Sequence, residues 1–310
     1  MEKQELLEIL NCNYENIFTD VNFYRDGGSL SYIVLSNDKQ YFLRIIRPEF
    51  LVTAVQSIDI HMFLQGHNFP VPVIVFTKDN QPYVTRKTDS QTNLLVLYEY
   101  IDGGEIDDTD VENIGELTAK LHNIMEHYTK PLKSRDKHFF IGRYVDILRS
   151  KGDHTADEYE RLGDMLWEKA KNLPKGFCHC DLYPGNILKS NDGKLYVLDF
   201  DTSCIAFPMY DITLFCNKTN YFEYSHEGFY KSELRLQHFL KGYLKHRTLT
   251  DEEMRAFYYF HVIYHYQVQA TIVEIYGIDC NEDDFEDKQL DWITSWIKKA
   301  ETDRGIDFGI

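Results

Sequence analysis

The sequence feature that most constrains the fold is the run FCHCDLYPGNIL at residues 177–188, with VLDFD following it at 197–201. Between these two runs lies the turn sequence SNDG at 190–193, flanked on both sides by residues with strand character. Because Asp-Gly pairs tolerate the positive φ angles that tight turns require, we predict a β-hairpin centred on this turn.

The predicted hairpin would bring polar side chains together at its open end. When the chain is folded about the turn, Asn186 lies near Asp199 across the strand pair, and Asp181 lies one short loop upstream. An amide oxygen and a carboxylate are hard ligands of the kind that suits Mg²⁺. Asp181 is then the remaining acid and the candidate for chemistry.

The pattern H-x-D-x-x-x-x-N, followed by a hairpin and an aspartate, resembles the catalytic and metal-binding loops of kinases. With its short spacer and no D-F-G, it is similar to the aminoglycoside phosphotransferase and choline kinase family. On this resemblance Asp181 matches the catalytic base, and Asn186 and Asp199 match the metal ligands. His179 matches the residue that supports the loop, and Asp211 matches a downstream aspartate that braces the loop by hydrogen bonds.

The resemblance implies an α+β, two-lobed fold like that of protein kinases. Residues 1–100 would form a small antiparallel-sheet lobe that binds the nucleotide and ends in the hinge. Residues 101–310 would form a mainly helical lobe with the catalytic loop and the acceptor site. The pattern of residues agrees, because strand-like segments at 18–24, 32–35 and 40–46 are separated by turn sequences.

The bend between the first two predicted strands is a candidate phosphate loop. Backbone N–H groups in such a bend can face phosphates. A Gly-Gly pair alone also fits an ordinary hairpin turn. The resemblance matches the bend to the family's glycine-poor nucleotide loop and gives Gly28, Ser29 and Ser31 as nucleotide-binding residues.

The third strand is expected to supply a cation to the α and β phosphates, paired with an acid on the next helix. Arg44 stands where the family usually has lysine, and its planar fork is wider than a lysine ammonium. Asp59 falls near the family's paired glutamate, with Gln56 as the alternative partner. The other interpretation of Arg44 is an edge-strand side chain that points into solvent.

An apolar strand at residues 93–101 runs into Gly-Gly and looks like the kinase hinge, whose main-chain groups hydrogen-bond adenine. The resemblance assigns the carbonyl of Glu99 and the N–H of Ile101 to adenine, with Tyr98 at the back of the pocket. A buried strand that ends at a glycine turn fits equally well, since this function uses backbone groups alone.

Residues 256–267 are aromatic on every side, which predicts a buried helix. Aromatic rings with nearby acids can hold ammonium groups, so Tyr259, Tyr266 and Glu274 are candidate acceptor contacts, with plain core packing as the alternative. His122 lies in a stretch similar to the family's G-x-x-x-A-x-L-H helix and is expected to be a packing residue.

The composition and charge of the chain limit the classes of binding partner. The 310 residues are 43% hydrophobic and 15% aromatic, enough for a substantial core. A net charge of −17 without basic patches disfavours nucleic acid, and no apolar run is long enough to span a bilayer. The charged N-terminal residues and six scattered cysteines predict a cytoplasmic protein with reduced thiols. No protein partner is implied.

We therefore predict an ATP- and Mg²⁺-dependent kinase that phosphorylates a hydroxyl of a small, amine-bearing molecule, with Asp181 positioning that hydroxyl. Aminoglycosides, choline or ethanolamine, homoserine-like compounds and sugars are the acceptor classes. The alternative is a catalytically impaired, kinase-like nucleotide-binding or scaffold protein, suggested by Arg44 and by Cys180 in place of the usual glycine. Retention of Asp181, Asn186 and Asp199 argues against it. A protein kinase is disfavoured because no A-P-E segment follows Asp199.

Overall fold

The structure, a computed structural model, describes residues 2–37, 39–88, 91–278, 280 and 284–309. The chain divides into two compact units, which we describe separately. The first comprises Met1–Ile106 and Gly185–Thr202, and the second Asp107–Pro184 and Ser203–Ile310. Asn186 and Asp199 therefore belong to the first unit, and Asp181 belongs to the second.

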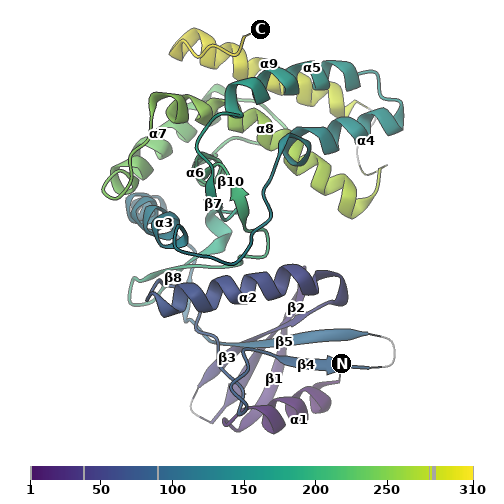
Figure 1. Ribbon diagram of the computed structural model, residues 1–310, viewed down its shortest axis with the longest axis vertical. Coiled ribbons are helices and arrows are strands. Elements are labelled where there is room, and N and C mark those ends of the chain that lie inside the picture. Colours follow the sequence, from purple (N-terminus) through teal and green to yellow (C-terminus); the bar gives the residue numbers. More distant parts are fainter. Residues whose placement is uncertain (1, 38, 89–90, 279, 281–283, 310) are drawn as a thin grey trace. The chain divides into compact units, whose positions relative to one another are not determined.

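The first unit is built on an antiparallel sheet of five strands in the order β1-β2-β3-β5-β4 (Figure 1). These strands are β1 (Phe18–Asp26), β2 (Ser29–Ser36), β3 (Gln40–Ile46), β4 (Val84–Lys87) and β5 (Thr92–Glu99). Helices α1 (Lys3–Asn13) and α2 (Leu51–Gly66) cover opposite faces of the sheet, and the short 3₁₀ turn Pro48–Phe50 precedes α2.

Both faces of the central strands are buried, which explains the uninterrupted apolar run of β5. Leu95 and Leu97 pack in the cluster that includes Leu6 and Leu10 of α1. Their neighbours in sequence, such as Val96, pack on the other face with residues of α2. The alternation predicts which β3 side chains share the α2 face, and Arg44 is one of them because Leu43 and Ile45 lie in the α1 cluster.

A small sheet joins the predicted hinge to the predicted hairpin, in the order β6-β8-β9. Its strands are β6 (Gly103–Gly104), β8 (Ile187–Ser190) and β9 (Leu195–Val197), and a 3₁₀ turn, Pro184–Asn186, precedes β8. A Cβ atom at Gly103 would lie 2.3 Å from the carbonyl oxygen of Lys189, so this close approach requires glycine.

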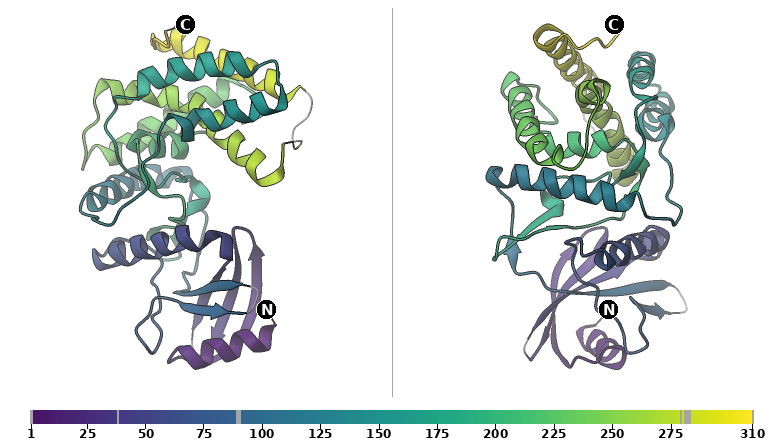
Figure 2. Two further views of the ribbon diagram at one scale, coloured as in Figure 1. Left: turned by 45° about the vertical axis from the view of Figure 1, so that its right-hand side comes forward. Right: turned by 60° about the vertical axis from the view of Figure 1, so that its left-hand side comes forward.

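The second unit is mainly helical. Its strands β7 (Gly176–Cys178) and β10 (Cys204–Ala206) form an antiparallel pair. Its helices are α3 (Val111–Met125), α4 (Arg143–Lys151), α5 (Ala156–Ala170), α6 (Pro208–Cys216), α7 (His226–Tyr243), α8 (Asp251–Tyr276) and α9 (Phe285–Arg304), with short turns at Asp108–Asp110 and His138–Gly142. The predicted aromatic helix is the central part of α8, which packs against α4, α5, α6 and α9 (Figure 2).

Two glycines bring α3 and α7 into direct backbone contact. A Cβ atom at Gly115 would lie 2.0 Å from the carbonyl oxygen of Phe239, and one at Gly242 would lie 1.8 Å from that of Glu112. This contact holds His122 of α3 beside Tyr243 of α7. Within the described residues, no helix combines the length and apolar character needed to cross a bilayer. The α+β prediction is confirmed.

Candidate active site

Arg44 is the centre of a charged cluster in the first unit. Its guanidinium lies 2.8 Å from Oδ2 of Asp201 and 3.7 Å from Oδ1 of Asp199. Its Nε donates a hydrogen bond to Oγ of Ser29 at 3.1 Å. Burial lowers the pKa of Arg44, but the carboxylates of Asp201 and Asp199 outweigh burial and raise it. Arg44 is therefore charged and held in place, and the solvent-pointing interpretation is wrong.

The register of the sheet explains these neighbours. Arg44 of β3 stands opposite Ser31 of β2, and Phe42 stands opposite Tyr98 of β5. Tyr98 is buried, and its burial raises the pKa of the phenol to about 12 although the charge of Arg44 opposes the shift. The predicted nucleotide-binding residues Ser29, Ser31, Arg44 and Tyr98 thus come together on one face.

Asp59, predicted as the partner of Arg44, lies in α2. The ion pairs that the structure gives to Arg44 run to Asp201 and Asp199, which follow β9. The pairing of Arg44 with Asp59 stays a prediction.

The predicted hairpin is confirmed and brings Asn186 beside the residues that precede Asp199. Ile187 pairs with Val197, and the N–H of Leu198 donates to the carbonyl of Asn186 at 2.9 Å. The Asn186 side chain is buried, whereas that of Asp199 is 35% exposed. The two predicted metal ligands therefore flank the open end of one strand pair, as expected.

The oxygen atoms of this cluster fit a divalent cation. Asp199 and Asp201 present two carboxylates, and Asn186 adds an amide. Among the described residues, Oδ1 of Asp201 is buried without a hydrogen-bond partner. An orphaned buried carboxylate oxygen is costly unless a cation or donor satisfies it, and hard oxygens suit Mg²⁺.

One residue at the predicted site has a strained backbone. Among the described residues, four that are not glycine have positive φ, and three of them, two asparagines and Asp199 at φ 58°, are of types that tolerate this region. The fourth is Cys180, at φ 61°. Such strain persists only where the surroundings impose it, and it clusters at functional sites. It also explains why a glycine suits the position of Cys180.

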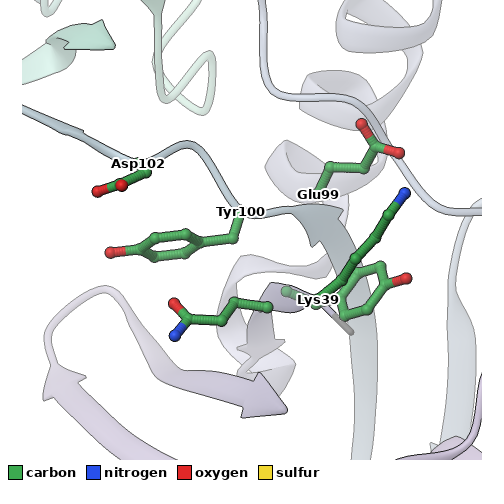
Figure 3. Close-up of a pocket in the computed structure, with 6 residues that line it drawn as sticks. Lys39, Glu99, Tyr100 and Asp102 are labelled. Carbon is green, nitrogen blue, oxygen red and sulfur yellow. The ribbon is translucent and has the colours of Figure 1, made fainter. Parts of the chain in front are cut away.

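The predicted hinge lies at the end of β5. The N–H of Glu99 donates to the carbonyl of Val73 at 2.8 Å, and the N–H of Tyr100 to that of Gln40 at 3.4 Å. A pocket of about 480 Å³ borders this strand end. Figure 3 shows Tyr100 and Asp102 reaching to one side of it and Glu99 and Lys39 to the other. Gly28 is exposed at the β1–β2 turn, and Ile101 is half-buried.

The predicted catalytic loop, in the second unit, is braced by Asp211, as expected. Asp211 is fully buried and accepts hydrogen bonds from the N–H groups of His179 at 2.7 Å and Cys180 at 2.8 Å. Nε2 of His122 lies 3.2 Å from Asp211, and its Nδ1 lies 2.9 Å from the hydroxyl of Tyr243. His122 is therefore a buried packing residue, as expected, and this network fixes the two residues before Asp181.

The charge of Asp181 acts on two buried tyrosines that sequence reasoning missed, Tyr264 and Tyr210. Burial raises the pKa of Tyr264, and the charge of Asp181 raises it further. Burial likewise raises the pKa of Tyr210, with Asp181 among the smaller causes, and the Tyr210 hydroxyl donates to Oε1 of Gln267 at 3.2 Å. Tyr264, Gln267 and Thr271 follow one another on one face of α8, because helix neighbours recur every three or four residues.

The candidate acceptor residues lie elsewhere on α8. Tyr259 and Tyr266 are buried, and their hydroxyls donate to the carbonyls of Asp307 at 3.0 Å and Tyr159 at 2.9 Å. These bonds favour the core-packing alternative for both. Glu274 is half-exposed and pairs with Arg143 at 2.8 Å.

The sulfur atoms near the catalytic loop are buried. Cys178, Cys180 and Cys204 are all buried, as is Cys216, in agreement with their prediction as small apolar residues. The described residues hold no group of three or more His, Cys, Asp or Glu side chains arranged to bind a metal.

The fold is that of the kinase-like phosphotransferases. Residues 21–256 match the phosphotransferase enzyme family, so the chain belongs to that family. Membership confirms the predicted class, an ATP-dependent small-molecule phosphotransferase.

Relatives and solved structures agree with this assignment. The homoserine kinase of Zymomonas mobilis is 23% identical over 271 residues, which cover 78% of this chain and 81% of that protein. The structure of an amicoumacin kinase with AMP-PNP and Ca²⁺ has a TM-score of 0.73 at 18% identity and covers 99% of this chain and 96% of that one. A microcompartment-associated aminopropanol kinase has a TM-score of 0.73 at 17% identity, with 98% and 99% covered. At such identities the structures show the shared fold.

Proposed function

We propose that the chain transfers the γ-phosphoryl group of ATP to a hydroxyl of a small molecule, with Mg²⁺ as the metal ion. Two observations support this proposal, one in each unit: the hairpin of the first unit holds Asp199 near Asn186, and Asp211 of the second unit braces the loop that ends in Asp181. Both features would serve in-line phosphoryl transfer, because its catalysis is mostly alignment and charge neutralisation.

The nucleotide would be held by residues of the first unit. Arg44 would contact phosphate oxygens from its position beside Asp199, and the β1–β2 turn with Gly28, Ser29 and Ser31 would offer backbone and hydroxyl donors. The main chain at Glu99 and Ile101 would bond adenine. Asp59 would assist Arg44 from α2.

The metal ion would be held by Asn186 and Asp199, next to the orphaned oxygen of Asp201. A bound Mg²⁺ neutralises charge on the transferred phosphoryl group. Arg44 would keep the two carboxylates from repelling each other before the ion arrives, since it is paired with both.

Asp181 would accept the hydrogen bond of the acceptor hydroxyl and aim its oxygen at phosphorus. His179 would support the loop through its buried ring and through the N–H bond to Asp211. Because alignment within fractions of an ångström decides such rates, the rigid brace behind Asp181 is part of the proposed machinery.

The acceptor would be a small hydroxyl compound that carries an amine, such as an amino alcohol or a hydroxy amino acid. A homoserine kinase and an aminopropanol kinase are among the similar proteins. Tyr264 and Gln267 would line its site beside Asp181. We further propose that the enzyme acts in the cytoplasm.

The alternative, an impaired scaffold, has less support. Arg44 retains its charge in contact with Asp199, and Cys180 adopts the positive φ that a glycine would take. Neither departure from the family pattern disturbs the residues proposed for transfer.

The test is an ADP-release screen with Mg·ATP over amino alcohols, hydroxy amino acids and aminoglycosides, followed by product identification. We expect turnover with one acceptor class, and its loss by roughly 10³-fold or more in Asp181→Ala while ATP binding by calorimetry is retained. Asp157→Asn, an exposed aspartate of α5, is the matched control and should keep full activity. ATP binding without turnover on any acceptor would favour the scaffold instead.

A further inference from the structure

Arg135 carries a positive charge that nothing in the described part of the chain neutralises. It is half-buried, its Nε is fully buried without a hydrogen-bond partner, and no described carboxylate lies within ion-pair distance. This is unexpected in a chain of net charge −17. Its guanidinium lies over the ring of Phe139, 4.0 Å from the centroid. A half-buried guanidinium without a described counter-ion can pair with an external anion.

A second arginine lies near the same ring. The guanidinium carbon of Arg143 is 4.7 Å from the centroid of Phe139. Burial lowers the pKa of Arg143, and the charge of Arg135 lowers it further, while Glu274 opposes the shift. Two guanidinium groups therefore share one aromatic ring, and Glu274, 2.8 Å from Arg143, compensates only one of them.

The segment that carries Arg135 is tied to the catalytic loop. The N–H of Arg135 donates to the carbonyl of Ile205 in β10 at 2.9 Å. Strand β10 pairs with β7, with Cys204 opposite Cys178. The sulfur atoms of Cys204 and Cys180 are 2.9 Å apart, and Cys180 precedes Asp181. One strand therefore separates Arg135 from the loop that presents Asp181.

Arg143 is linked to the same region through α8. Its guanidinium donates to Oγ1 of Thr271 at 3.3 Å and to the carbonyl of Gln267 at 3.4 Å. The side chain of Gln267 accepts the hydroxyl of Tyr210, and the charge of Asp181 is among the smaller causes that raise the pKa of this tyrosine. An acceptor whose hydroxyl meets Asp181 and whose other end lies along this face of α8 would meet the two arginines.

We propose that Arg135, with Arg143 beside it on Phe139, binds a carboxylate of the acceptor, which makes a hydroxy amino acid the preferred acceptor over an amino alcohol without a carboxylate. The inference rests on the proposed function. A guanidinium fork matches a carboxylate with two parallel hydrogen bonds, and the ring of Phe139 shields one face of the planar fork from water. Arg135 supplies the uncompensated charge, and Arg143, already paired with Glu274, supplies orientation.

The test compares two acceptors that differ only in the carboxylate, L-homoserine and 3-aminopropan-1-ol. We expect the wild-type enzyme to favour L-homoserine in kcat/KM. Arg135→Ala should lower kcat/KM for L-homoserine by roughly 10- to 100-fold, mainly through KM, and leave that for 3-aminopropan-1-ol and the Kd of ATP unchanged. Arg135→Lys, which keeps the charge without the fork, should recover part of the loss. Arg149→Ala, an exposed arginine of α4 paired with Glu160, is the control.

A second readout does not depend on turnover. Calorimetric binding of L-homoserine to the enzyme without nucleotide should be detectable in the wild type and in Arg149→Ala and weakened at least tenfold in Arg135→Ala. The inference is overturned if the wild type prefers 3-aminopropan-1-ol, if Arg135→Ala leaves the KM and Kd of L-homoserine unchanged, or if its main effect is on ATP. Absence of turnover with every acceptor would instead refute the proposed function, and the binding comparison would still decide the role of Arg135.

Discussion

Asp201 in the first unit and Asp211 in the second are both carboxylates of the proposed machinery, but their hydrogen-bond donors differ. Asp201 is 28% exposed and pairs with the side chain of Arg44. Asp211 is fully buried and accepts main-chain N–H groups of the catalytic loop. A side-chain donor can move when a ligand arrives, whereas a main-chain donor moves only if the loop does. The first arrangement suits exchange of partners, and the second suits fixed geometry.

The largest effect is expected for substitution of Asp211. Asp211→Ala leaves two buried N–H groups and His122 without their acceptor, so we expect the free energy of unfolding to fall by about 3–5 kcal/mol and transfer activity to vanish. Urea unfolding and ADP release measure both. Asp211→Asn, which keeps one acceptor oxygen, should lose less. A variant Asp211→Ala within 1 kcal/mol of wild type would contradict the role of the brace.

The next largest effect is expected in the pH dependence of stability, which should come from buried histidines of the second unit. Burial lowers the pKa of His261 to about 3 and of His265 to about 4, both in α8. Unfolded histidine takes up a proton near pH 6.5, so the unfolded state binds more protons than the folded state below that pH, and stability falls as the pH drops from about 7 to 4. The loss should be about 2 kcal/mol per histidine at pH 5.

Urea unfolding at pH 8 and pH 5 checks this prediction. His265→Gln should reduce the difference between the two pH values, whereas His67→Gln, an exposed residue of the first unit, should leave it unchanged. Equal stability at both pH values would show that these rings are not held neutral.

Asp201→Ala should lower stability much less than Asp211→Ala does. Since Asp201 is partly exposed, its loss should change the free energy of unfolding by no more than about 1 kcal/mol. Released from this partner, Arg44 should position phosphates less well, and we expect the KM for ATP to rise roughly tenfold. Steady-state kinetics and calorimetry measure these effects, with Asp192→Ala in the exposed hairpin turn as control. A stability loss as large as that of Asp211→Ala would refute the distinction.

The smallest expected effect is at Cys180. Cys180→Gly removes a positive-φ penalty of about 1 kcal/mol and loses a similar amount of packing against Cys204, so stability should stay within about 1 kcal/mol of wild type and activity should persist. Cys180→Val, with a branched Cβ that resists this φ, should lose at least 2 kcal/mol. Equal stability of the two variants would argue against strain.

The hairpin and the brace at Asp211 could be predicted from local sequence patterns. The Asp-Gly turn gave the hairpin, and with it the register that brings Asn186 next to Leu198. The family motif gave the brace at Asp211. Such features depend on short stretches of chain or on a resemblance, and both can be seen in a single sequence.

Other contacts depend on how distant segments face one another. The ion pair of Arg44 with Asp201 joins residues 157 positions apart. Tyr264 shares an aromatic helix with Tyr259 and Tyr266, and composition alone does not tell which of these phenols is affected by the charge of Asp181. Only packing of α8 against its neighbours separates them.

The first unit is discontinuous in the chain, since β8 and β9 complete a sheet with β6 from far upstream. During synthesis this unit must wait for Thr202, on the order of ten seconds after Ile106 at ribosomal rates of about 5–20 residues per second. Chimeras between relatives would have to exchange both segments together, because a graft of residues 1–106 alone would pair a foreign Gly103 with the native Lys189 across their tightest approach.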